Sequence, residues 1–233
     1  MTNTVSYTLH DNVATIAMDD GKANALSTEM IVQLNAAFDK AQEDEAIVVI
    51  TGRDGVFSGG FNLKEMQKGQ QEAIALTAKG SKLARRILAF PKPVIALASG
   101  HSIAMGAFLL LACDYRMIAD GEYKVGLNET LIGMTMHNFG IELARFRLPN
   151  HYFNRCVINA EIFDAKGAVD AGFVDRTVPQ EQMAGAAAMA GKLFSQLDMT
   201  AFRNTKLRSR KDAFAILDQA IEDDLDPAKV HAV

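Results

Sequence analysis

The sequence predicts an α/β fold in which buried parallel strands alternate with helices. Residues 46–52 (AIVVITG) and 94–99 (VIALAS) are continuous apolar segments, as is typical of strands that are buried on both faces of a parallel sheet. A stretch with helical periodicity follows each of them. Strands and helices that alternate in this way are joined by right-handed crossovers, so we expect a sheet with helices packed against it.

The remaining elements can be placed in chain order. Alternating apolar and polar residues over 5–9 and 13–18, on either side of Asp11-Asn12, predict a hairpin. Ser27 is a candidate N-cap for the helix that follows, because the next apolar residues recur at helical spacing. Further along, the sequence predicts helices over about 71–88 and 104–112 and a strand over 115–119.

The chain divides into a core and a helical tail. We assign residues 1–178 to the α/β core and residues 179–233 to a C-terminal segment that contains only helices. The amphipathic stretches of the tail suit an arm that packs on a neighbouring subunit. No Gly-, Ser- or Pro-rich linker separates the two parts.

Composition and charge exclude several classes of function. The 233 residues are 49% hydrophobic and carry a formal net charge of -4, so nucleic acid is not an expected partner. Two cysteines far apart indicate a reducing compartment, and five histidines at irregular spacing predict no metal site. The longest apolar run, residues 103–113, is too short for a membrane span, and the first residues do not look like a secretory signal. We therefore expect a cytoplasmic protein.

Two segments share one pattern, which points to a binding site. Both VVITGRDGVFSGGFNLKEM and VIALASGHSIAMGAFLLLA run from a buried strand through a glycine-bearing turn into a helix. Ligands of α/β proteins gather at the carboxyl ends of such strands, and helix starts present N–H groups that favour negative charge. Two such ends side by side would form a two-donor site for an oxyanion.

Each candidate also has a plain structural explanation. Gly59-Gly60 can be an ordinary tight turn, and the apolar helix after Gly100 can simply be buried core. A serine-hydrolase elbow is excluded because Val56 stands where its first glycine belongs, and no phosphate- or dinucleotide-binding glycine motif is present. A lone turn histidine such as His101 is more often structural than catalytic.

Glu129 is the candidate proton carrier. It lies between apolar residues in VGLNETLIG. If its side chain points into an apolar pocket, loss of solvation raises its pKa toward neutrality, where a carboxyl group can both accept and return a proton.

Together these segments resemble the enoyl-CoA hydratase/isomerase (crotonase) family in order and spacing. Further along, DAKGAVDAGFVDRTVP also resembles a segment of that family. The likeness is clear from about Val5 to Pro179 and looser over the tail. The residues that carry it are Phe57, Gly60, Leu63, Lys64, Glu65, Met66, Lys92, Pro93, Gly100, Gly106, Leu109, Cys113 and Asp114. The resemblance implies a crotonase-like superhelix of repeated ββα units and a homotrimer or hexamer.

The resemblance also assigns roles to residues of the site. It implies that the backbone N–H groups of Phe61 and Met105 hold the thioester oxygen of an acyl-CoA, and that their side chains narrow the pocket. The hydratases of the family use two glutamates. By the resemblance, Phe108 occupies the position of the first, and Glu129 occupies the position of the second. Coenzyme A would be part of the substrate, with no separate cofactor. The implied substrate-binding residues are Ala23, Ser58, Gly59, Gly60, Asn62, Leu63 and Phe108, with Lys22 and Lys64 as phosphate partners.

A single glutamate favours one reaction of the family over another. Hydration needs one group for the water and another to protonate carbon, whereas a 1,3-proton shift needs one shuttle. The segment LACDYRMIAD…GLNET also resembles Δ3,Δ2-enoyl-CoA isomerases of fatty acid metabolism. We therefore expect an isomerase-like enzyme; the alternatives are a hydratase or another crotonase reaction, and a non-catalytic acyl-CoA-binding subunit. His137 and Asn138 replace apolar residues and could add polar groups near the acyl tail.

Overall fold

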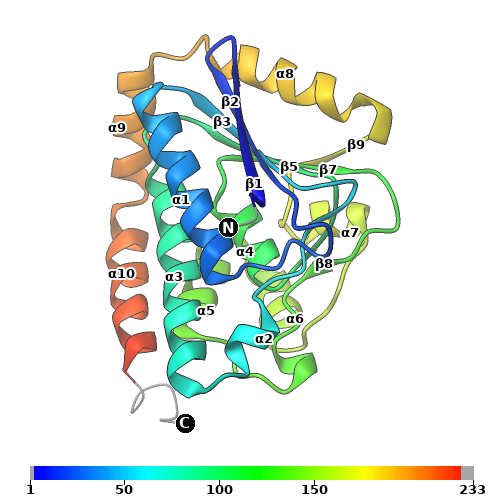
Figure 1. Cartoon of the computed structure of the whole chain (residues 1–233), viewed down its shortest axis with the longest axis vertical. Helices are drawn as coiled ribbons and strands as arrows, with labels where there is room; N and C mark the ends of the chain where they lie inside the picture. The colour runs from blue at the N-terminus through cyan, green and yellow to red at the C-terminus, as the bar shows by residue number, and fades with distance from the viewer. Residues whose placement is uncertain (1–2, 227–233) are drawn as a thin grey trace.

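The computed structural model describes residues 3–226, which form two sheets and the helices around them (Figure 1). The larger sheet has the strand order β1-β2-β3-β5-β7-β9. Its first two strands are antiparallel and the others run parallel, with Val48 opposite Val94 and Ile95 opposite Tyr115. Its strands are β1 (Val5–His10), β2 (Val13–Met18), β3 (Ile47–Thr51), β5 (Val94–Ala98), β7 (Tyr115–Ala119) and β9 (Arg176–Val178).

The smaller sheet explains how the chain repeats. It consists of β4 (Gly55–Ser58), β6 (Gly100–Ile103) and β8 (Val125–Gly126), in that order and all parallel. Each of β3, β5 and β7 in the larger sheet is thus followed by a strand in the smaller one and then by a helix. This is the repeated ββα arrangement that the resemblance predicts, and the fold class is confirmed.

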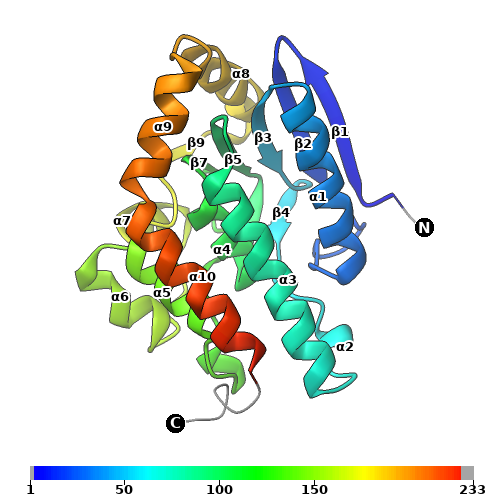
Figure 2. The ribbon, with the colours of Figure 1, turned by 90° about the vertical axis from the view of Figure 1, so that its left-hand side faces the viewer.

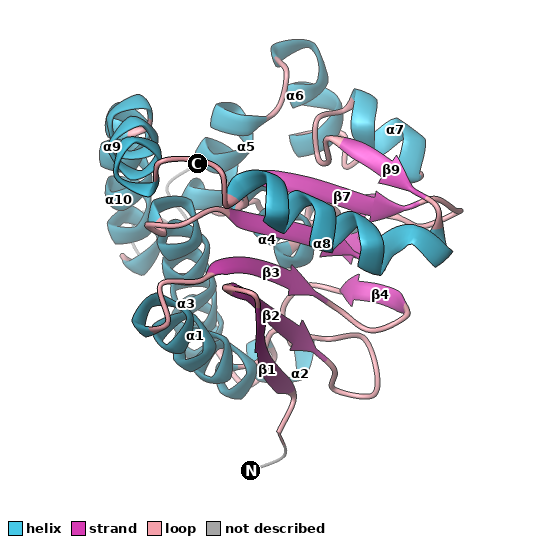
Figure 3. Cartoon of the chain, turned by 90° about the horizontal axis from the view of Figure 1, so that it is seen from above, coloured by secondary structure: helices cyan, strands magenta, loops and turns pink. Residues whose placement is uncertain are grey.

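Helices cover both faces of the larger sheet, as Figure 3 shows from above. Alternate residues of a strand point to opposite faces. Val49 and Ile95 therefore pack under α8 (Met183–Phe194), whereas Val48 and Ile50 belong to the main core on the other face. The other helices are α1 (Thr28–Glu43), α2 (Leu63–Met66), α3 (Gln70–Ala89), α4 (Met105–Ala112), α5 (Asn138–Arg147), α6 (Asn150–Val157), α7 (Ala165–Asp170), α9 (Met199–Ser209) and α10 (Lys211–Leu225), with 3₁₀ turns η1 (Thr130–Ile132) and η2 (Gln180–Gln182).

The helical tail is bound to the core of its own chain. Asp114, the residue directly before β7, accepts hydrogen bonds from Lys206 Nζ at 2.6 Å and from Arg210 at 2.9 Å. All three side chains are largely buried. The predicted subunit-joining arm thus also completes its own subunit, and its role in oligomerisation stays a prediction. Within residues 3–226, no helix has the length and apolar character needed to cross a membrane.

Candidate active site

Two turns at the ends of parallel strands of the smaller sheet meet at the predicted oxyanion site. Gly60 follows β4 and has φ +96°, a conformation that favours glycine. A Cβ built on Gly60 would lie 2.8 Å from the Cβ of Ala104 and 3.4 Å from the backbone nitrogen of Met105. The turn that presents Phe61 and the first residue of α4 therefore lie against each other, and a side chain at position 60 would force them apart.

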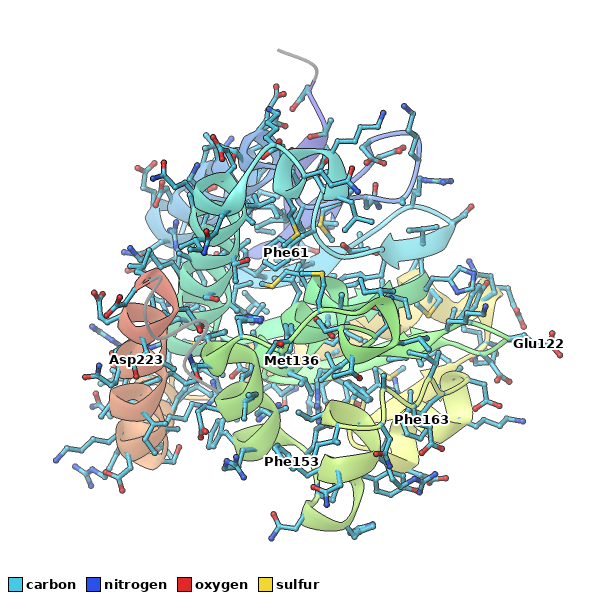
Figure 4. All side chains as sticks on the ribbon, turned by 90° about the horizontal axis from the view of Figure 1, so that it is seen from below. Phe61, Glu122, Met136, Phe153, Phe163 and Asp223 are labelled. Carbon is cyan, nitrogen blue, oxygen red and sulfur yellow. The ribbon has the colours of Figure 1, made fainter. Side chains whose placement is uncertain are left out.

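Both backbone N–H groups are unpaired among the described residues. Leu26 forms backbone hydrogen bonds to both neighbours of Phe61. The Leu26 N–H donates to Gly60 O (2.8 Å), and the Leu26 carbonyl accepts from Asn62 N (3.1 Å). The Phe61 N–H takes part in neither bond. Met105 is the first residue of α4, where an N–H has no partner inside the helix. Neither N–H donates to an acceptor in the part of the chain that the structure describes. Phe61 lies near the middle of the face seen in Figure 4, with sulfur atoms on both sides.

The residue before Met105 has a strained backbone. Ala104 has φ +51° and ψ -122°, a region that L-residues rarely occupy and that costs about 1–3 kcal/mol. Its N–H donates to Gly126 O at 2.9 Å, and its carbonyl accepts from Phe108 N at 3.1 Å. The bond to Gly126 ties the turn before Met105 to the segment that carries Glu129.

A cavity of about 440 Å³ opens in front of these turns. Its walls come from residues within 20–25, 59–66 and 128–134, together with Ala104. The Glu129 side chain lines it and is only 7% exposed. Its Oε2 atom has no partner in the described structure. Burial raises the pKa of Glu129 to about 7, so this carboxyl group has the properties expected of a proton carrier.

A second carboxyl group at the cavity, Asp20, has a structural role. It accepts backbone N–H bonds from Lys22 (2.8 Å), Asn24 (2.8 Å) and Ala25 (3.1 Å). Burial alone would raise the pKa of Asp20, but these three donors and the positive charge of Arg53 together outweigh burial, and the pKa is lowered. Asp20 therefore stays ionised and shapes the 20–25 loop.

The predicted binding residues separate into two groups. Ala23, Gly59, Asn62, Leu63 and the two lysines, Lys22 and Lys64, line the cavity. Ser58, Gly60 and Phe108 do not line it, and their part in substrate binding stays a prediction. Ser58 is fully buried and donates to Asn24 O (2.8 Å), while the Gly60 N–H donates to Ser58 Oγ (3.3 Å).

Phe108 is fully buried in the core. Its ring lies edge-on to His137, with 5.4 Å between ring centroids. His137 does not line the cavity, nor does Asn138, which bonds to Asp224 instead. The Met105 side chain is also buried, beside Gly80 of α3. Of the two predicted oxyanion residues, Phe61 lines the cavity and Met105 does not.

Sequence reasoning missed some residues of the site. Asp20 is one of them, although Asp-Asp-Gly-Lys-Ala-Asn is a turn signal that can indicate an aspartate bonded to its own loop. Asn128 also lines the cavity, and its buried Oδ1 has no partner among the described residues. His101, taken as structural, accepts a bond from Lys124 N at 2.8 Å.

A comparison with family models shows to which family the chain belongs. The model of the enoyl-CoA hydratase/isomerase family matches residues 8–226, nearly the whole chain. The chain belongs to the enoyl-CoA hydratase/isomerase family.

Individual relatives agree on the family and differ in the reaction. The structure of an enoyl-CoA hydratase/isomerase family protein from Pseudomonas syringae is 48% identical, with a TM-score of 0.95 over 99% of both chains. A structure named as a Mycobacterium tuberculosis enoyl-CoA isomerase is 41% identical, with a TM-score of 0.92 over 96% of this chain and 98% of that one. Another structure of the same protein is named a probable enoyl-CoA hydratase. A probable enoyl-CoA hydratase of Bacillus subtilis is 30% identical over 74% of this chain and 68% of its own length.

Proposed function

We propose that this enzyme moves the double bond of an enoyl-CoA from the 3- to the 2-position. The observation that carries the proposal is the pairing of two free N–H groups with one available carboxyl group. Of the two carboxyl groups in the described cavity wall, Asp20 is held ionised by three N–H donors, while Glu129 has a pKa of about 7 and an unpartnered oxygen.

The proposed reaction uses these groups in one sequence. The thioester oxygen accepts hydrogen bonds from the N–H groups of Phe61 and Met105, which makes the C2 protons more acidic. Ionised Glu129 takes a proton from C2, and the negative charge spreads over the thioester oxygen and the former double bond. Protonated Glu129 then returns the proton to C4. No other atom is gained or lost, so one shuttle suffices.

The residue at position 108 argues against efficient hydration. A hydratase needs a second group to manage water, and Phe108, at the position that the resemblance assigns to it, is an apolar side chain in the core. Hydratase activity, another crotonase reaction and acyl-CoA binding without catalysis are the alternatives that the experiment below separates.

The coenzyme A part of the substrate would enter beside the 20–25 loop. Ala23, Gly59, Asn62 and Leu63 line this part of the cavity wall. Lys22 and Lys64 lie on the same wall and supply positive charge for phosphate groups.

The variant Glu129→Gln tests the proposal. We expect a fall in isomerisation of 3-enoyl-CoA of roughly 10²–10⁴-fold, because glutamine cannot carry the proton. Binding of a saturated acyl-CoA, measured by calorimetry, should persist. Separate incubations with 3-enoyl-CoA and with trans-2-enoyl-CoA show which substrate is converted.

Glu122→Gln is the matched control, because Glu122 is exposed at a distant loop (Figure 4). It should behave like the wild type. Rapid conversion of trans-2-enoyl-CoA to a hydroxyacyl-CoA would favour the hydratase, and binding without any conversion would favour the non-catalytic subunit.

A further inference from the structure

We infer that Asp224, in the C-terminal helix α10, is a positioning residue that holds the loop carrying Glu129. The role given to Glu129 rests on the proposed function. Asp224 is 5% exposed, and its carboxylate accepts three hydrogen bonds from the first two residues of α5. These come from Asn138 N at 2.7 Å, Asn138 Nδ2 at 2.9 Å and Phe139 N at 2.9 Å.

The position of Glu129 depends on both ends of its loop. At one end, Gly126 of β8 pairs with Ile103 of β6, which fixes the backbone three residues before Glu129. At the other end, residues 134–137 have no regular secondary structure and lead into α5. Asp224 fastens that second end, because its negative charge binds the free N–H groups where α5 begins.

The same helix supports the opposite wall of the cavity. Arg85 of α3 pairs with Asp218 of α10 at 2.7 Å and lies over the Phe214 ring at 3.8 Å. Gly80 of α3 in turn packs against the Phe61 ring. Figure 2 shows α10 running along both α3 and α5, in agreement with the contacts between these helices. One helix therefore contacts both α3, which packs against Phe61, and α5, which follows the loop that carries Glu129.

This arrangement assigns a function to a residue that does not line the cavity. If α5 loses its hydrogen bonds to Asp224, the loop before α5 can shift. Glu129 then moves relative to the Phe61 and Met105 N–H groups. A shift of 1 Å between reacting groups can lower turnover on the order of 100-fold. The coenzyme A side, residues 20–25 and 59–64, has no bond to Asp224 and should bind as before.

The variant Asp224→Asn tests the inference. Asparagine keeps one acceptor oxygen but presents an NH₂ group to an N–H donor. We expect kcat to fall roughly 10- to 100-fold while the dissociation constant of a saturated acyl-CoA changes less than twofold. Amide hydrogen exchange should become faster over residues 127–139 and stay unchanged over residues 55–64.

Glu222→Gln is the matched control, because it removes one negative charge from the exposed side of the same helix. It should leave kcat and exchange unchanged. Wild-type kcat and wild-type exchange in folded Asp224→Asn would overturn the inference, as would equal effects of the two variants. If Asp224→Asn does not fold, Asn138→Ala can replace it, because that variant removes only the side-chain donor. Asn138→Ala should change kcat and exchange in the same direction but by less. Wild-type kcat and exchange in Asn138→Ala would then overturn the inference.

Failure of the inference and failure of the proposed function give different results. The exchange measurement needs no reaction and tests the anchoring directly. If Glu129→Gln keeps full activity, the proposed function fails whatever Asp224 does. If Glu129→Gln is inactive and Asp224→Asn is fully active, only the inference fails.

Discussion

Gly60 and Gly106 allow backbone segments to approach each other at the site more closely than any side chain would permit. A Cβ on Gly106 would lie 2.3 Å from Ser58 O, and one on Gly60 would meet the Cβ of Ala104. The sequence could indicate that the turn at Gly59-Gly60 was special, because glycine is the usual residue for such conformations. It could not show which backbone each glycine faces, because that depends on how two distant turns pack.

Gly60→Ala should therefore damage the oxyanion site. The added methyl group must push the Phe61 turn away from Met105, which amounts to losing one N–H donor. We expect kcat to fall about 10²–10³-fold, as measured with 3-enoyl-CoA. Gly55→Ala is the control, since Gly55 also has a positive φ (+78°) but open space around its Cβ position. Equal activity of the two variants would show that the close approach is not needed.

Glu129 should make stability depend on pH. Its pKa is about 7 in the folded chain and 4.5 when solvated, so the folded state binds the proton more tightly. The stabilisation is fully present below pH 4.5 and is lost as the pH rises through 7. The loss amounts to at most about 3 kcal/mol.

Glu129→Gln cannot ionise and should escape this loss. Urea unfolding at pH 5 and pH 8 should show the variant gaining up to about 3 kcal/mol relative to wild type at the higher pH. If the two proteins differ in free energy of unfolding by the same amount at pH 5 and pH 8, Glu129 is solvated in the folded chain.

Elements with a strong apolar pattern could be predicted, and weakly patterned ones could not. The strand over 115–119 coincides with β7, and the helix over about 71–88 with α3. The smaller sheet was missed, because β4, β6 and β8 are only two to four residues long and contain glycine. This sheet positions the residues of the candidate site, because β6 leads into Met105 and β8 leads into the segment that carries Glu129. The family resemblance supplied what periodicity could not.

The buried ion pairs of Asp114 with Lys206 and Arg210, which join the core to the tail helices, should contribute strongly to stability. Asp114→Ala leaves Lys206 and Arg210 buried without their carboxylate, which typically costs about 3–5 kcal/mol. Asp39→Ala is the control: it breaks the pair with Arg86, in which the Asp39 side chain is 66% exposed, and should cost at most about 1 kcal/mol. Urea unfolding measures both. A loss for Asp114→Ala as small as that of the control would mean that the tail is not held by this cluster.

At the scale of the whole molecule, the core and the tail work as one unit. The proposed boundary at residue 178 coincides with the end of β9, yet α9 and α10 pack on the core and α10 touches helices behind both walls of the cavity. Trimers or hexamers stay a prediction of the resemblance. The family is fixed by the match over residues 8–226, and the reaction is the part that depends on Glu129.

The transfer of a proton by Glu129 at an acyl-CoA held by the Phe61 and Met105 N–H groups can be followed with a labelled substrate. We would supply 3-enoyl-CoA with two deuterium atoms at C2 and locate the label in the product by NMR. The account predicts 2-enoyl-CoA that keeps one deuterium at C2 and carries deuterium at C4, formed more slowly than from unlabelled substrate. Product without deuterium at C4, recovery of only unreacted substrate, or the same transfer in Glu129→Gln would contradict it.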